Sequence, residues 1–103
     1  MNLRIHRLAV AEIDREVDYY ESRQVGLGLE LEDEIDSAFS LIVQFPAAAP
    51  QWRHRKDRRV AVLDRFPFTI PYQITHEDIV VLALAHTSRR PDYWTRRSIS
   101  TTR

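Results

Sequence analysis

The spacing of apolar residues divides the chain into a first half with helical periodicity and a second half with strand periodicity. Residues 3–5 alternate between apolar and polar side chains, which predicts a short first strand. From Leu8 the apolar spacing changes to three or four residues and predicts an amphipathic helix that ends near Arg23. No usual N-cap residue precedes Ala9. The apolar stripe of this helix consists of Ala9, Ile13, Val17 and Tyr20, and its polar face of Glu12, Asp14, Arg15, Glu16, Asp18 and Glu21.

A second amphipathic helix is predicted from about Gly28 to Phe45. The glycine pair at its start predicts a turn between two antiparallel helices, and the proline that follows it ends it. Acidic residues crowd between Glu30 and Asp36, where the positive end of the helix dipole favours them. Because they form one dense run, they indicate a solvated or partner-facing surface rather than a metal or acid–base site. The apolar stripe consists of Leu31, Ile35, Ala38, Phe39, Ile42 and Val43.

Three strands are predicted after a basic loop at residues 46–57. The first covers residues 58–64. The second, at residues 68–75, alternates strictly between apolar and polar side chains, so its apolar residues share one face of the sheet. A hairpin turn at residues 76–78 leads to the third strand, at residues 79–85. This last strand is apolar on both faces, which predicts a central strand that is covered on both sides.

These elements predict an α+β fold in the order β-α-α-β-β-β. A short N-terminal strand and an antiparallel helix hairpin precede the other strands, and the hairpin packs on one face of a mainly antiparallel four-stranded sheet. Pro71 lies inside the second of the three later strands and predicts a bulge or a free edge, because proline has no amide hydrogen for the ladder. We expect one domain over residues 1–97 and a flexible tail at 98–103. The sheet face opposite the helices is expected to be open, with basic residues around a concave binding surface.

Composition excludes several classes of chemistry. The chain has 103 residues, of which 44% are hydrophobic, which suits one domain with a real core. It has no cysteine, which excludes disulfides, thiolate catalysis and cysteine-ligated metals. The four histidines show no ligand spacing, so no metal site and no cofactor are expected. No apolar run is long enough for a secretory signal or a membrane span, so we expect a cytoplasmic protein with no membrane partner.

Charge is divided along the chain although the formal net charge is zero. Residues 1–50 hold four basic and ten acidic side chains, and residues 51–103 hold eleven basic and five acidic ones. Fourteen of the fifteen basic residues are arginine, which binds phosphate or carboxylate through two parallel hydrogen bonds. The ratio of arginine to lysine is also consistent with genomic base composition alone. The basic half indicates a surface for phosphates or for an acidic protein partner. Trp52 in the basic loop is either a stacking residue or a buried anchor.

Several phrases, in their order and spacing over roughly residues 3–97, resemble the RelE/ParE superfamily of type II toxins, also called plasmid-stabilisation proteins. The phrases are Ala-Glu-Ile at 11–13, Tyr-Tyr-Glu at 19–21, Gly-Leu-Gly at 26–28, Arg-Phe-Pro-Phe-Thr-Ile at 65–70 with Tyr72, the apolar run with His86 at 79–86, and Arg-Arg-Pro-Asp-Tyr-Trp at 89–94.

The resemblance implies a toxin that inhibits growth and is neutralised by a cognate antitoxin. Such an antitoxin wraps the toxin and supplies the part that binds operator DNA. This chain would therefore contact operator DNA only indirectly, through the antitoxin. One branch of the superfamily cleaves messenger RNA on the ribosome, and the other inhibits DNA gyrase without cleaving RNA. We expect the antitoxin to lie along a sheet edge, beside the first strand, or along the helix hairpin, with its acidic residues facing the arginine-rich half.

The ribonuclease branch needs a base, an acid and cations at the scissile phosphate. The candidates that the resemblance offers for that chemistry are Lys56, His86, Arg89 and Tyr93. Where that branch would place an arginine on the second strand, this chain has Asp64, and a carboxylate there would repel a phosphate. His86 is the best titratable candidate, but a histidine at a strand end also forms backbone hydrogen bonds without any chemical role. Trp94 is expected to close the C-terminal end of the chain against the sheet.

The Phe-Pro-Phe segment, the Tyr-Tyr-Glu helix and the C-terminal Tyr-Trp phrase are closer to the ParE-like branch. We therefore predict a toxin that binds DNA gyrase and is not an enzyme. The alternatives are a ribosome-dependent mRNA endonuclease and a non-toxic binding module of the same fold. The predicted target-binding residues are Arg58, Arg59, Arg65, Arg89, Arg90 and Tyr93.

Overall fold

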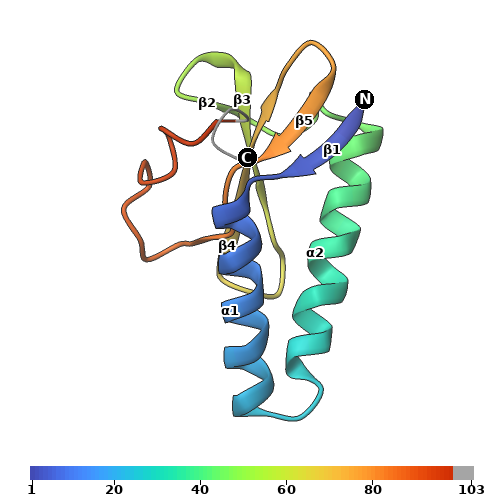
Figure 1. Ribbon diagram of the computed structural model, residues 1–103, viewed down its shortest axis with the longest axis vertical. Coiled ribbons are helices and arrows are strands. Elements are labelled where there is room, and N and C mark those ends of the chain that lie inside the picture. Colours follow the sequence, from blue (N-terminus) through green and yellow to red (C-terminus); the bar gives the residue numbers. More distant parts are fainter. Residues whose placement is uncertain (99–103) are drawn as a thin grey trace.

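A hairpin of two helices covers one face of a sheet in the computed structural model, which describes residues 1–98 (Figure 1). The last five residues of the predicted tail lie outside the described residues. Helix α1 (Arg7–Arg23) and helix α2 (Leu27–Gln44) run antiparallel, and their connecting turn lies beyond the end of the sheet. The strands are β1 (Asn2–Ile5), β2 (Gln51–Trp52), β3 (Arg55–Val62), β4 (Phe68–Ile74), β5 (Asp78–Val81) and β6 (Ala85–His86).

The strand order in the sheet is β1-β5-β4-β3-β2, with β6 paired to β4 beyond the end of β5. Strand β1 runs parallel to β5, and the other pairs are antiparallel. This confirms the predicted α+β class and the predicted element order, with β1, β3, β4 and β5 as the four main strands. No helix within residues 1–98 is long and apolar enough to cross a membrane.

The main core lies between the helices and the sheet. Phe68, Ile70 and Tyr72 on alternate positions of β4 are buried there, as their spacing predicted. They pack in one cluster with residues from both helix stripes, including Leu31 and Ile35 of α2. The two amphipathic helices therefore derive their stability mainly from this shared apolar layer.

Helix α1 begins at Arg7, and His6 is its N-cap residue. The His6 ring nitrogen Nδ1 accepts a hydrogen bond from the amide of Leu8 at 3.1 Å. The ring is buried, and its desolvation together with the charges of Arg97 and Arg7 lowers the pKa of His6, against a smaller opposing effect of Glu12. The neutral ring that results is the form that serves as an acceptor. Histidine is not among the usual cap residues, so the sequence pattern did not reveal this start.

The turn between the helices depends on both glycines. Gly26 has φ of 90°, which favours glycine, and it precedes α2 directly. The side chain of Glu21 accepts hydrogen bonds from the amides of Gly26 and Gly28, at 2.8 and 3.0 Å. A Cβ atom on Gly28 would lie 2.6 Å from the carbonyl oxygen of Val17. The close approach of the two helices therefore requires glycine at position 28.

The predicted third strand is split into β5 and β6 at the level of Pro71. Tyr72 pairs with Val81 and Thr69 pairs with Ala85, so two residues of β4 face three residues of the partner. This is a bulge, as the proline predicted. The amide of Leu82 donates to the Pro71 carbonyl at 2.8 Å, but Pro71 has no amide to give in return.

The predicted loop at 46–57 is wrong in its second half, because β2 and the start of β3 form a hairpin there. Its two central residues, Arg53 and His54, have φ values of 48° and 63°. Two-residue turns of this kind usually contain asparagine or glycine, and neither is present to indicate the turn. Strand β3 consequently begins at Arg55, three residues earlier than predicted.

Replacing Gly28 by alanine should lower the free energy of unfolding by about 1–3 kcal/mol, the usual range for overpacking a tight contact. The clash with Val17 and Glu21 outweighs the gain in helix propensity of about 1 kcal/mol. Leu29→Ala, at an exposed position one residue later, should change the stability by no more than about 0.5 kcal/mol. Urea unfolding of the three proteins measures both effects, and equal stability of Gly28→Ala and wild type would contradict the close helix approach.

Candidate target-binding site

The sheet face opposite the helices is partly covered by the chain's own C-terminal segment, residues 87–98. The expectation of an open face is therefore wrong, and the expectation that Trp94 closes this end is confirmed. Trp94 is 2% exposed and packs with Val80 and Leu82, which point away from the helices. The cause is the apolar run 79–85, whose second face also has to be removed from water.

The carboxylate of Glu12 holds this segment against the fold. Glu12 is 5% exposed, although the helical pattern placed it on the polar face of α1, and that placement is wrong. Its Oε1 atom accepts from the amide of Leu84 at 3.1 Å and from Arg97 Nη1 at 2.9 Å. Its Oε2 atom accepts from the Tyr93 hydroxyl at 2.9 Å and from Arg97 Nη2 at 3.0 Å. Arg97 also donates to the carbonyl of Leu82.

Tyr93 is fixed in position from both of its ends. Its hydroxyl donates to Glu12, and its ring lies 3.9 Å from the Arg89 guanidinium carbon and 5.1 Å from that of Arg97. Burial and the neighbouring Glu12 carboxylate raise the pKa of Tyr93 to about 12. The hydroxyl is therefore neutral near pH 7 and is already used as a donor.

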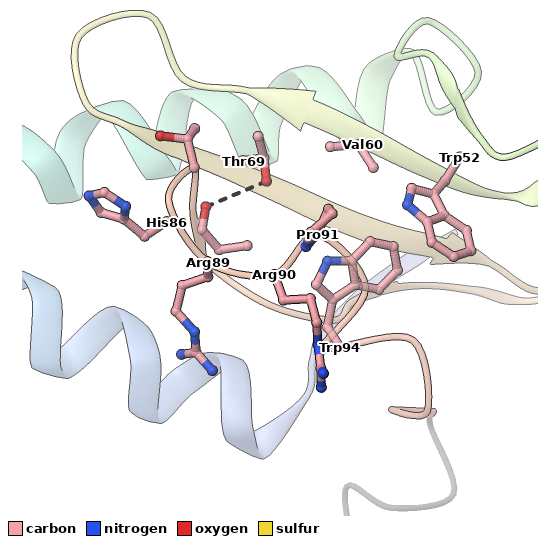
Figure 2. A pocket seen from close by; sticks show the side chains of 10 residues that line it. Trp52, Val60, Thr69, His86, Arg89, Arg90, Pro91 and Trp94 are labelled. Carbon is pink, nitrogen blue, oxygen red and sulfur yellow. Dashed lines mark hydrogen bonds between the residues drawn. The ribbon is translucent and has the colours of Figure 1, made fainter.

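A pocket of about 220 Å³ lies between this segment and the sheet (Figure 2). Its walls include the indole rings of Trp52 and Trp94, whose centroids are 5.0 Å apart at an interplanar angle of 61°. The Thr69 hydroxyl donates to the Ala85 carbonyl at 3.5 Å on the sheet side. The complete lining is Trp52, Val60, Thr69, Ala85, His86, Thr87, Arg89, Arg90, Pro91 and Trp94.

His86 lines one end of the pocket and forms local contacts. Its Nδ1 atom accepts from the amide of Ser88 at 3.0 Å and lies 2.7 Å from the Ser88 hydroxyl oxygen. The ring makes an edge contact with Phe68. These contacts match the interpretation of His86 as a histidine at a strand end that is hydrogen-bonded to the backbone.

The predicted target-binding arginines separate into two groups. Three of them interact within the fold: Arg58 donates to the Thr95 carbonyl, Arg59 to the carbonyls of Ala47 and Ala49, and Arg65 to the carboxylate of Glu30. Arg89 and Arg90 are exposed at the pocket, where Arg90 pairs with Asp92 at 3.4 Å. The structure thus places Arg89, Arg90 and His86 at the pocket together with the two tryptophans. Tyr93 contacts Arg89 but is not part of the pocket lining.

Lys56 lies far from His86, the titratable ribonuclease candidate. Arg58 pairs with Gln73 near one end of β4, and His86 pairs with Phe68 at its other end. Lys56 precedes Arg58 and lies farther still from Phe68, so the separation is about seven strand residues, or roughly 20 Å. Lys56 and His86 therefore do not meet at one phosphate.

A second, apolar surface lies between α2 and β3. It is a groove of about 340 Å³ in which Leu41 and Phe45 are each 59% exposed and Val62 is 66% exposed. Beyond Val60, strand β3 pairs with β4 on one side and has no strand on its other side within the described residues. These exposed residues were not predicted as a binding surface, although Leu41 is an apolar residue outside the predicted apolar stripe of the helix and was a usable signal.

Comparison with known proteins gives one family and one fold. The family model described as the ParE toxin of the type II toxin-antitoxin system, parDE, matches residues 3–91. A solved structure described as the chromosomal ParDE TA system from P. aeruginosa superposes with a TM-score of 0.70 at 24% sequence identity. The match covers 84% of this chain and 95% of that chain. None of the curated proteins matches the chain.

Replacing Glu12 by glutamine should lower the free energy of unfolding by about 3–5 kcal/mol, because it leaves the partly buried Arg97 guanidinium without its counter-charge. The near-UV circular dichroism of the tryptophans should weaken too, since Trp94 lies in the segment that Glu12 holds. Glu16→Gln removes a carboxylate 3.9 Å from Arg15 at the surface and should cost no more than about 0.5 kcal/mol. Equal effects of the two substitutions in urea unfolding would refute the role of Glu12.

Proposed function

Because the chain belongs to the ParE toxin family of type II toxin-antitoxin systems, we propose that it arrests growth by binding DNA gyrase. The contact surface in this proposal is the sheet face that carries the pocket, with Arg89 and Arg90 beside it. The observation that carries the proposal is the combination there of an apolar pocket with exposed guanidinium groups, which suits a protein partner. We expect the protein to act in the cytoplasm, where this target works.

The geometry gives little support to a ribonuclease. The Tyr93 hydroxyl is held by Glu12 with a raised pKa, so it is poorly suited to accept a proton from a ribose hydroxyl. Nδ1 of His86 already accepts from Ser88, and Lys56 lies roughly 20 Å away along the sheet. An acid, a base and a phosphate-binding lysine therefore do not converge among these candidates, whereas binding to a protein requires no such convergence.

Purified protein should abolish supercoiling when it is incubated with relaxed plasmid, gyrase and ATP. Arg90→Glu should weaken the inhibition, because it reverses a charge at the proposed contact, whereas Arg15→Glu on the exposed side of α1 should not. Unaffected supercoiling at excess protein would count against gyrase. Codon-phased cuts in translated messages, lost in His86→Ala, would favour the ribonuclease alternative. Unchanged colony counts on expression without antitoxin would favour a non-toxic binding module.

We further propose that the antitoxin binds in the groove between α2 and β3 and adds a strand to β3. The groove exposes large apolar side chains, and the edge of β3 offers free backbone groups beside them. This position differs from the edge beside β1 that the sequence suggested, although β1 also pairs on only one side within residues 1–98. The antitoxin would also supply the contact with operator DNA.

Val62→Asp should weaken antitoxin binding at least tenfold, mainly by faster dissociation, because it places a charge in an apolar contact. Val62 is largely exposed in the free toxin, so the stability of the toxin itself should change little. Val43→Asp is the matched control, since Val43 is exposed beside β1 in a different groove. Surface plasmon resonance with the purified antitoxin separates the two sites. Weakening by Val43→Asp alone would place the antitoxin at the β1 edge instead.

A further inference from the structure

The pocket beside the two contacting tryptophans is small, with a volume of about 220 Å³. We propose that it receives one large apolar side chain from an acidic segment of the toxin's protein target. The inference rests on the proposed function, because it assigns this side chain to the protein target proposed above. It adds the chemistry by which that target is recognised.

The lining of the pocket selects an apolar group. Val60 and Ala85 line it on the sheet side, and Pro91 and the indole rings of Trp52 and Trp94 enclose it (Figure 2). Such a surface gains free energy when it excludes water around an apolar side chain. Tryptophans in a concave site are also typical of residues that dominate binding between proteins.

The polar atoms of the lining are already occupied in part. The Thr69 hydroxyl donates to Ala85, and Nδ1 of His86 accepts from Ser88. A nucleobase in the same position would need hydrogen-bond partners for its edges, and burying those edges without partners costs free energy. The pocket therefore favours a hydrocarbon or aromatic side chain over a base.

The charges around the pocket favour acidic residues next to the apolar residue of the bound segment. Arg89 and Arg90 are exposed, and in Figure 2 their side chains extend away from Thr69 and Val60. Arg53 is also exposed and stacks on Trp52, with 4.5 Å between its guanidinium carbon and the ring centroid. Asp92, which pairs with Arg90, offsets only part of this charge. A segment with carboxylates on both sides of its apolar residue complements this arrangement.

The two tryptophans give a direct signal for occupancy, because they are the only two in the chain and both line the pocket. We would titrate the protein with a short capped peptide in which one leucine is flanked on each side by aspartates, and follow its intrinsic fluorescence. The fluorescence should change saturably. A peptide with alanine in place of the leucine should bind roughly ten- to a hundredfold more weakly, because it loses most of the buried apolar surface. Added salt should also weaken the binding of the leucine peptide.

Two substitutions fill the pocket from different sides. Thr69→Phe fills it from the sheet and Thr87→Phe from the segment after β6, and each should abolish the response to the peptide. Ser22→Phe adds the same side chain at the exposed end of α1 and should leave the response unchanged. A cooperative urea transition shows that each variant folds. Because Thr87 is exposed, its variant keeps the test decisive if Thr69→Phe does not fold.

A flat titration, equal binding of the leucine and alanine peptides, or full binding by the folded Thr87→Phe protein would overturn the inference. A single-stranded oligonucleotide that bound more tightly than the peptide and was excluded by Thr87→Phe would overturn it in favour of a nucleic-acid site. The supercoiling assay separates this inference from the proposed function. Inhibition of gyrase that survives Thr87→Phe refutes the pocket alone, whereas peptide binding without inhibition of gyrase refutes gyrase alone.

Discussion

One buried carboxylate, that of Glu12, determines how the second face of the sheet is closed. Pro71 cannot donate to the ladder, so the partner strand bulges between β5 and β6 and the amide of Leu84 finds its acceptor in Glu12 of α1. Burying a carboxylate costs several kcal/mol unless its oxygens are satisfied, and both oxygens here receive two hydrogen bonds each. Two of those bonds come from Arg97 as a bidentate pair, which is the strongest geometry available. The C-terminal segment thus lies where the charge requirement of Glu12 places it, and the pocket is a consequence.

The same need for hydrogen-bond partners explains why the arginine-rich half is not a uniform cationic surface. Arg58, Arg59 and Arg97 each donate to backbone carbonyls of residues that lie outside the strands. Arginine is suited to this role because its guanidinium carries five donors in a fixed plane and stays charged when partly buried. Net charge along the sequence therefore overstates the charge available to a partner.

The sequence predicted the structural features that depend on one residue or on residues close to one another in the chain. The alternation of β4 and the stripe of α2 each follow from one local pattern, and Pro71 predicted its bulge because its missing amide is a property of the residue itself. The role of Glu12 was out of reach, because its partner Arg97 lies 85 residues away and a glutamate in a helix pattern is assigned to solvent. The turn at Arg53 and His54 was missed because neither residue is a usual left-handed one. The candidate site shows the same difference. The sequence predicted the arginines as a group, but which of them interact within the fold depends on tertiary contacts.

The two proposed binding surfaces meet at one residue of β3. Val60 lines both the pocket beside Trp94 and the groove beside α2, because β3 carries one surface on its face and the other along its edge. A strand added to the edge of β3 would therefore lie directly beside the pocket. On the proposed assignment, an antitoxin could exclude the target by occupying adjacent space, with no change in the conformation of the toxin. A rigid sheet that shares one strand between two surfaces converts the binding of one partner into the exclusion of the other through sterics alone.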